Sequence, residues 1–244
     1  MQKSSAFFKQ DNETESNLIK LYPEICFQNI IGFGGAFTES AGYVYSQMSD
    51  TDKNKFLQMY FEDNCYNLGR LHIQSCDFAL GNYCYEEDPS DLNLVKFTLK
   101  RDEKYIIPLV QDAVKINPNM RFIASPWSPP AFMKTNGDMN NGGKLKREYY
   151  QMWADMISEY VYLYRNAYGI YIDRLTVQNE PNATQKWDSC LFTAEEEADL
   201  ACNYLRRSLN KLNLNDVKIL CYDHNKDKIL ERANSIFYMK TQWM

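Results

Sequence analysis

A carboxyl group between an amide and a proline, in the segment LTVQNEP, is the clearest chemical signal in the sequence. Glu180 follows an apolar stretch, with Asn179 before it and Pro181 after it. Proline ends strand pairing and restricts the turn, so this carboxyl is expected at the end of a strand. In partly desolvated surroundings a carboxyl stays protonated and can donate its proton, which is the acid step of glycoside hydrolysis. The structural alternative is a rim glutamate that forms an ion pair with a neighbouring arginine.

Polar or aromatic residues also follow four other apolar stretches. They are Glu39, Asp77, Trp127 and the pair Asp223 and His224. In a parallel barrel the carboxyl ends of all strands open onto one face, so these side chains are expected at one mouth. Each of them is weak evidence alone, because an acidic residue after a strand is often the N-cap of the next helix.

Other chemistries find little support. The two histidines, His72 and His224, lack the spacing of a metal motif. His72 is expected in the core, and His224 at the rim, where it could touch a substrate. Cys76 beside Asp77 could act as a nucleophile, but no histidine base is placed for it. No P-loop or G-x-S-x-G segment is present, and no metal or cofactor is expected.

Five short apolar or β-branched stretches alternate with helical patterns along the chain. They begin near Ile31, Arg70, Arg121, Arg174 and Lys218. Nearly continuous apolar strands that alternate with helices indicate an α/β fold, with a parallel sheet covered by helices.

Helices are predicted from capping residues, apolar stripes and a terminal glycine. They are expected after Ser49, over residues 105–116, over residues 148–168 with Gly169 at the end, after Thr193 in a capping box with Glu196, and over residues 226–238.

Two architectures suit this alternation, an open nucleotide-binding sheet and a closed eight-stranded barrel. Gly32, Gly34 and Gly35 resemble the glycine-rich turn of the first type. The third glycine of that motif would fall at Phe37, whose side chain prevents the close approach of helix and strand. The sequence therefore favours the barrel.

Composition narrows the function further. Of the 244 residues 45% are hydrophobic and 24% charged, the net charge is −5, and no basic stripe is present, which argues against nucleic acid as a partner. The 18 Tyr, 13 Phe and 4 Trp are expected mainly in the core, with some rings free to stack on sugars. No signal peptide or membrane span is seen, and the seven cysteines lack C-x-x-C spacing. Reduced thiols in a cytoplasmic protein are the expectation.

Four motifs together resemble glycoside hydrolase family 30, which includes glucosylceramidase and related β-glucosidases. They are FGGAFTES, SCDF, SPWSPPAFMKTNG and VQNEP, in this order, and the likeness runs from Phe27 to Asn225. The resemblance implies a (β/α)8 TIM barrel and a retaining hydrolase of O-glycosyl bonds that acts on β-glucosides. Its partner would be a carbohydrate or glycolipid substrate, in carbohydrate or sphingolipid metabolism.

The resemblance also implies roles for five residues. Glu180 matches the acid/base of the family, and Asn179 matches the amide that contacts the sugar 2-hydroxyl. Asp77 and Trp127 match residues that hold glucose hydroxyls in glucosylceramidases. Arg70 matches an arginine near the catalytic carboxyls.

The chain departs from the family pattern after the fifth strand. The nucleophile of the family is a second glutamate at the end of strand seven, whereas about five β/α units are predicted here. Residues 1–23 are expected to form a polar lead and residues 24–244 a partial barrel without strands six to eight. The β-sandwich side domain would be absent, apart from a possible first strand over residues 24–29. Glu231 lies in a helical pattern and cannot replace the nucleophile, so this chain alone is expected to be inactive.

Two alternatives stay open. One is another specificity of the same family, β-1,6-glucanase or xylanase, although Asp77 in SCDF favours action on a terminal glucosyl group. The other is a truncated, non-catalytic sugar-binding protein. The aglycone and the oligomeric state are not predicted from the sequence.

Overall fold

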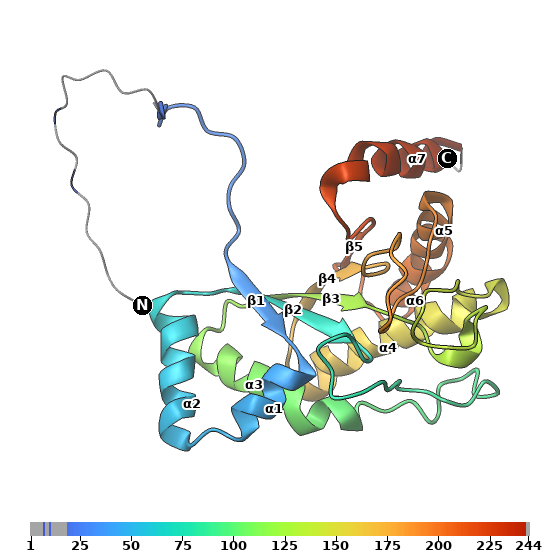
Figure 1. Cartoon of the computed structure of the whole chain (residues 1–244), viewed down its shortest axis with the longest axis horizontal. Helices are drawn as coiled ribbons and strands as arrows, with labels where there is room; N and C mark the ends of the chain where they lie inside the picture. Colours follow the sequence, from blue (N-terminus) through green and yellow to red (C-terminus); the bar gives the residue numbers. More distant parts are fainter. Residues whose placement is uncertain (1–6, 8–9, 11–18, 243–244) are drawn as a thin grey trace. The chain divides into compact units, whose positions relative to one another are not determined.

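The computed structural model describes residues 7, 10 and 19–242, within two compact units, Met1–Ile31 and Gly32–Met244. Figure 1 shows that the second unit alternates strands with helices along the chain. In the first unit residues 24–29 form no strand, so the strand predicted there for a side domain is not confirmed. Over the described range, no helix is both long and apolar enough to cross a membrane.

Five parallel strands form one sheet, in the same order in space as in the sequence. The strands are β1 Gly34–Phe37, β2 Leu68–Ile73, β3 Arg121–Pro126, β4 Ile172–Thr176 and β5 Lys218–Leu220. A doubly wound sheet reverses its strand order at a switch point, whereas a barrel adds each strand beside the previous one. The sequential order therefore confirms the predicted truncated (β/α) barrel.

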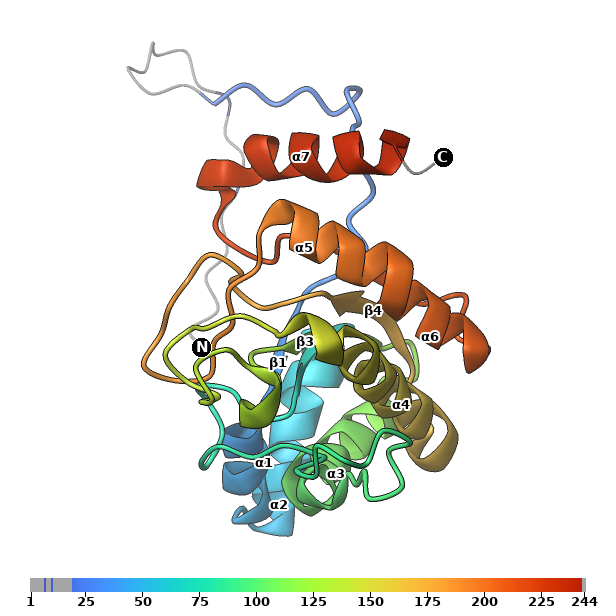
Figure 2. The same ribbon diagram turned by 90° about the vertical axis from the view of Figure 1, so that its right-hand side faces the viewer.

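Helices and helical turns follow the strands along the chain; α3 and α4 lie beside the sheet, whereas α7 packs against α5 (Figure 2). The α-helices are α1 Glu39–Ser46, α2 Asp50–Leu57, α3 Lys100–Ile116, α4 Tyr150–Tyr168, α5 Ala194–Asp199, α6 Arg206–Lys211 and α7 Ile229–Gln242. Two π-helical segments, η1 Gln58–Asp63 and η4 Leu200–Leu205, extend α2 and join α5 to α6. Among the described residues the 3₁₀ turns are η2 Ala131–Met133, η3 Arg147–Tyr149 and η5 Lys226–Lys228.

The predicted capping residues act as expected. The Ser49 hydroxyl accepts the N–H of Asp52 at 3.2 Å at the start of α2. Thr193 and Glu196 form a reciprocal capping box before α5. Gly169 ends α4 at φ 69°, a left-handed conformation that glycine adopts without a steric cost.

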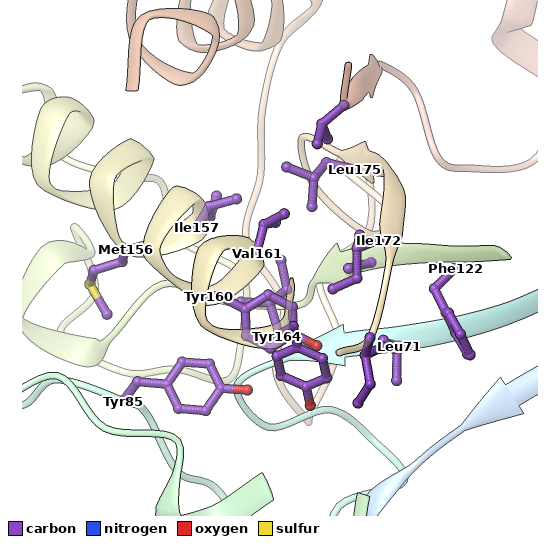
Figure 3. Packing of buried hydrophobic residues seen from close by; sticks show 14 of the residues in the cluster. Leu71, Tyr85, Phe122, Met156, Ile157, Tyr160, Val161, Tyr164, Ile172 and Leu175 are labelled. Atoms are coloured by element: carbon purple, nitrogen blue, oxygen red, sulfur yellow. The ribbon is translucent and has the colours of Figure 1, made fainter. Parts of the chain in front are cut away.

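The core lies between α4 and the sheet. In Figure 3, Tyr160 and Tyr164 of α4 lie close to Leu71 of β2 and Ile172 of β4, and all four side chains are fully buried. Because side chains alternate along a strand, Leu71 on the helix side places its neighbour Arg70 on the opposite face. Packing on one face thus determines which residues of the strands are available for chemistry on the other.

Many of the aromatic residues serve this core. Tyr83, Tyr85 and Tyr164 donate hydrogen bonds of 3.0, 2.8 and 2.7 Å to the buried carboxylate of Asp102 in α3. Burial raises the pKa of Asp102 to about 6, and the three hydroxyl donors oppose that rise. The expectation that most rings pack in the core holds for these residues.

Candidate active site

Arg70, in the middle of β2, connects residues from four successive strands. Its Nη2 donates to Asn179 Oδ1 at 2.8 Å and to Asp223 Oδ2 at 2.6 Å. Its Nε donates to Ser125 Oγ of β3 at 3.3 Å. Ser125 and Arg70 are one-third exposed or less on the face away from α4, and Asn179 and Asp223 follow β4 and β5. The predicted convergence of strand-end residues is therefore present here.

Glu180 lies next to this cluster in a strained turn. Its φ of 46° is unusual for a residue other than glycine and costs about 1–3 kcal/mol. The turn is held by its N–H, which donates to the Asp223 carbonyl at 2.8 Å, and by its carbonyl, which accepts from Ala183 at 2.9 Å. The side chain is half-buried and Gln185 Nε2 donates to Glu180 Oε2 at 3.4 Å. Within the described part of the chain Glu180 joins no ion pair, so the alternative of a rim glutamate paired with an arginine gains no support.

Trp127 lies between Arg70 and Asp77. The guanidinium of Arg70 is 4.7 Å from the centre of the Trp127 ring, a cation–π contact. The Trp127 side chain also donates a hydrogen bond to the carboxylate of Asp77. Asp77 is an exposed residue in the loop after β2. Partial desolvation raises the pKa of Asp77, and the charge of Glu180 adds to the rise, whereas Trp127 and Arg70 oppose it. All five predicted site residues therefore belong to one continuous group.

Glu39 does not join this group, contrary to the expectation from the strand ends. It is fully buried as the first residue of α1, where Arg101 of α3 pairs with its carboxylate and Leu80 donates to it at 2.7 Å. The cause is the early start of α1, which turns the side chain toward α3.

His72 is a core residue, as predicted. Its Nε2 accepts the backbone N–H of Glu39 at 3.0 Å, and its Nδ1 donates to the Gln74 carbonyl at 2.5 Å. Burial lowers the pKa of His72, so the ring is neutral. His224 packs its ring 5.8 Å from that of Tyr222. Contact between His224 and a substrate stays a prediction.

Other nucleophile and metal chemistry gains no support. Burial raises the pKa of the Cys76 thiol to about 12, which keeps it protonated and unreactive. All seven cysteines are free thiols. Among the residues that the structure describes, no group of three or more His, Cys, Asp or Glu is placed to hold a metal ion.

Three contributors to the site had no assigned role from the sequence. Ser125 orients Asp223 through a 3.1 Å hydrogen bond, Asp223 pairs with Arg70, and Gln185 reaches back to Glu180. Asp223 was expected at the mouth from its place after a predicted strand, although no role was assigned to it. Ser125 is one of several buried serines, and nothing in the sequence around it marks it as part of a site. Gln185 acts through a loop whose shape the sequence does not reveal.

Comparisons with known proteins agree with this arrangement. The glycosyl hydrolase family 30 TIM-barrel domain matches residues 30–241. Putative glucosylceramidase 3 of Caenorhabditis elegans is 35% identical over 237 residues, covering 93% of this chain and 45% of the worm protein. The crystal structure of SrfJ from Salmonella typhimurium has a TM-score of 0.85 and 49% identity, over 88% of this chain and 49% of that one.

The endo-β1,6-glucanase BT3312 is a further similar structure, with a TM-score of 0.81 and 28% identity over 89% of this chain and 51% of its own. The chain thus spans about half the length of these relatives. The family match covers nearly the whole second unit, including the five strands and the Arg70 cluster. The chain belongs to glycosyl hydrolase family 30.

Proposed function

We propose that this chain supplies the acid/base half of a retaining β-glucosidase of the glucosylceramidase type. The observation that carries the proposal is the place of Glu180, in a strained turn bonded to Asp223 and directly after Asn179, which Arg70 orients. Such a turn fixes a proton donor relative to the sugar before reaction. The glucosylceramidase relative supports a β-glucoside or glycolipid as the substrate class.

In the proposed reaction Glu180 protonates the glycosidic oxygen as the bond to the sugar breaks. In the second half it accepts a proton from the water that hydrolyses the glycosyl-enzyme. Asn179 binds the sugar 2-hydroxyl through the amide group that Arg70 orients. Asp77, bonded by Trp127, takes glucose hydroxyls at the floor of the site. The charge of Arg70 stabilises the carboxylates that surround the sugar.

A retaining mechanism also needs a nucleophilic carboxylate about 5–5.5 Å from the acid. Asp223 is assigned to the ion pair with Arg70, which Ser125 supports with a second hydrogen bond to the same Oδ2. Asp77 is assigned to the sugar hydroxyls. We therefore propose that residues 1–244 do not turn over glycosides without a further part that supplies the nucleophile.

Two other functions compete with this one. The similarity to an endo-β1,6-glucanase favours cleavage inside a 1,6-linked glucan. A non-catalytic sugar-binding protein would keep the Asp77 and Trp127 floor but hydrolyse nothing.

A completed chain, in which residues 1–244 are followed by the part of SrfJ that lies beyond the matched segment, separates these functions. We expect the completed chain to hydrolyse aryl β-glucosides and glucosylceramide faster than a β-1,6-glucan. We expect the 244-residue chain alone to hydrolyse none of them. Turnover by the chain alone would show that it contains a nucleophile. Binding of glucosides without turnover by the completed chain would favour the sugar-binding alternative.

A further inference from the structure

Lys134 is a charged residue in a fully buried position, on the loop after β3 (residues 127–146). Its side chain has no exposed surface. Its ammonium group donates to two backbone carbonyls, that of Met139 at 2.9 Å and that of Ser189 at 2.6 Å. Burial of an ammonium group is costly and lowers the pKa of Lys134, with Asp138 and Asp188 as the nearby opposite charges. A position of this kind requires a reason other than packing.

The two carbonyls belong to two different loops, which follow the neighbouring strands β3 and β4. Met139 lies on the loop after β3, and Ser189 lies on the loop after β4 (residues 177–193). The Ser189 N–H donates to the same Met139 carbonyl at 3.1 Å, and the Leu191 N–H donates to Gly143 at 2.8 Å. Lys134 thus donates hydrogen bonds to both loops at the place where they meet, and it does so from the interior of the protein.

Further hydrogen bonds link the contact between the two loops to Glu180, the proposed acid. The Asn141 N–H donates to the Gln185 carbonyl at 2.8 Å, and the Gln185 N–H donates to Ser189 Oγ at 3.1 Å. The backbone of Gln185 is therefore bonded to both loops. Its side chain then donates to Glu180 Oε2 at 3.4 Å.

We propose that Lys134 is a positioning residue, which holds the loop after β4 in the one arrangement that brings Gln185 against the carboxylate of Glu180. The inference rests on the proposed role of Glu180 as acid/base. Lysine suits the position because it offers several donors to two carbonyls, while its alkyl stem fills the interior between the loops. An apolar residue of the same length would leave both carbonyls without this donor.

The test compares Lys134→Met with two controls in the 244-residue chain. Lys144→Met removes the same charge from the same loop, where the side chain forms an exposed ion pair with Glu196. Val161→Ala destabilises the buried face of α4 and belongs to neither loop. We expect amide hydrogen exchange at Asn141 and Ser189 to accelerate at least tenfold in Lys134→Met and to change little in either control.

A second measurement follows the link to Glu180 and does not depend on turnover. In the wild-type chain, Glu180→Gln should shift the side-chain amide resonances of Gln185 in NMR spectra. In the Lys134→Met background the same substitution should leave those resonances unchanged. Lys134→Gln, which keeps one donor, provides an intermediate variant if Lys134→Met does not fold.

The catalytic consequence is measured in the completed chain. Lys134→Met should lower kcat at least tenfold more for alkyl glucosides, which have poor leaving groups, than for activated aryl glucosides. A purely structural defect, as in Val161→Ala, should lower both rates equally. Unchanged exchange at Asn141 and Ser189, a preserved Gln185 response, or equal loss of the two rates would each overturn the proposal. An inactive wild-type completed chain would instead count against the proposed function, since exchange and NMR decide the Lys134 link separately.

Discussion

Arg70 and Asp223 form an ion pair of 2.6 Å that joins the middle of β2 to the segment after β5, three strands away in the sheet. The same guanidinium bonds Asn179 and lies over the ring of Trp127. One side chain therefore fixes the relative position of β2, β4 and β5 at the face where the proposed chemistry takes place.

Replacing Arg70 by Met should destabilise the second unit. It leaves the carboxylate of Asp223 and the amide of Asn179 without their charged donor. Hydrogen bonds to charged groups contribute about 1.5–3 kcal/mol, which lowers the Tm of a domain of this size by about 3–12 °C. Scanning calorimetry of the 244-residue chain measures this loss. Arg121→Met, at the exposed start of β3, is the matched control and should leave Tm unchanged. Equal Tm values for both variants would mean that Arg70 adds nothing to the assembly of the site.

Replacing Asp77 by Ala should weaken the handling of glucosides. A charge-assisted bond to a sugar hydroxyl contributes about 1.5–3 kcal/mol, so kcat/KM of the completed chain should fall by about 10- to 150-fold. Asp63→Ala, at an exposed position at the end of η1, serves as the control. Wild-type kinetics in Asp77→Ala would show that Asp77 is only a loop residue.

The order of strands and helices could be predicted from the sequence because it depends on local signals. The Ser49 and Thr193 caps and the terminal Gly169 appear where they were predicted, and each of the five strands begins within three residues of its predicted start. The grouping of Asp77, Trp127 and the Asn179–Glu180 pair followed from strand order alone, since parallel strands end on one face.

Contacts between side chains that lie far apart in the sequence could not be predicted in this way. Glu39 was expected at the mouth but is buried against Arg101, because nothing local specifies which helix a side chain will meet. Lys134 lies in a recognised motif, yet its partners Met139 and Ser189 are backbone atoms whose positions depend on the paths of two loops. Contacts made through loop backbones carry no pattern in side-chain types.

Acidification should stabilise the second unit through Glu197. Burial raises the pKa of this carboxyl to about 7, against the opposing effects of the Tyr222 N–H and Arg232. A raised pKa means that the folded state takes up a proton at a pH where the unfolded state is still ionised. The contribution of Glu197 to stability is therefore gained as the pH falls from about 7 to 4.5, and it is lost again at higher pH.

Glu197→Gln isolates this effect, because Gln cannot take up the proton. The Tm of the wild type should rise relative to that of Glu197→Gln as the pH is lowered from 8 to 5. The difference between the two proteins cancels the opposite contribution of His72, whose pKa is lowered by burial. Glu148→Gln, at an exposed position, should show no such trend. A wild-type advantage that shrinks on acidification would contradict the assigned direction.

The central claim, that Glu180 is the acid/base, is tested most directly by the dependence of Glu180→Gln on the leaving group. In the completed chain this variant should lower kcat/KM for alkyl glucosides by about 10²–10⁴-fold, because their poor leaving groups need a proton donor. Activated aryl glucosides need little protonation, and their loss of kcat/KM should be at least tenfold smaller. Glu231→Gln, in α7, should affect neither substrate. An equal loss on alkyl and aryl glucosides would show that Glu180 does not protonate the leaving group.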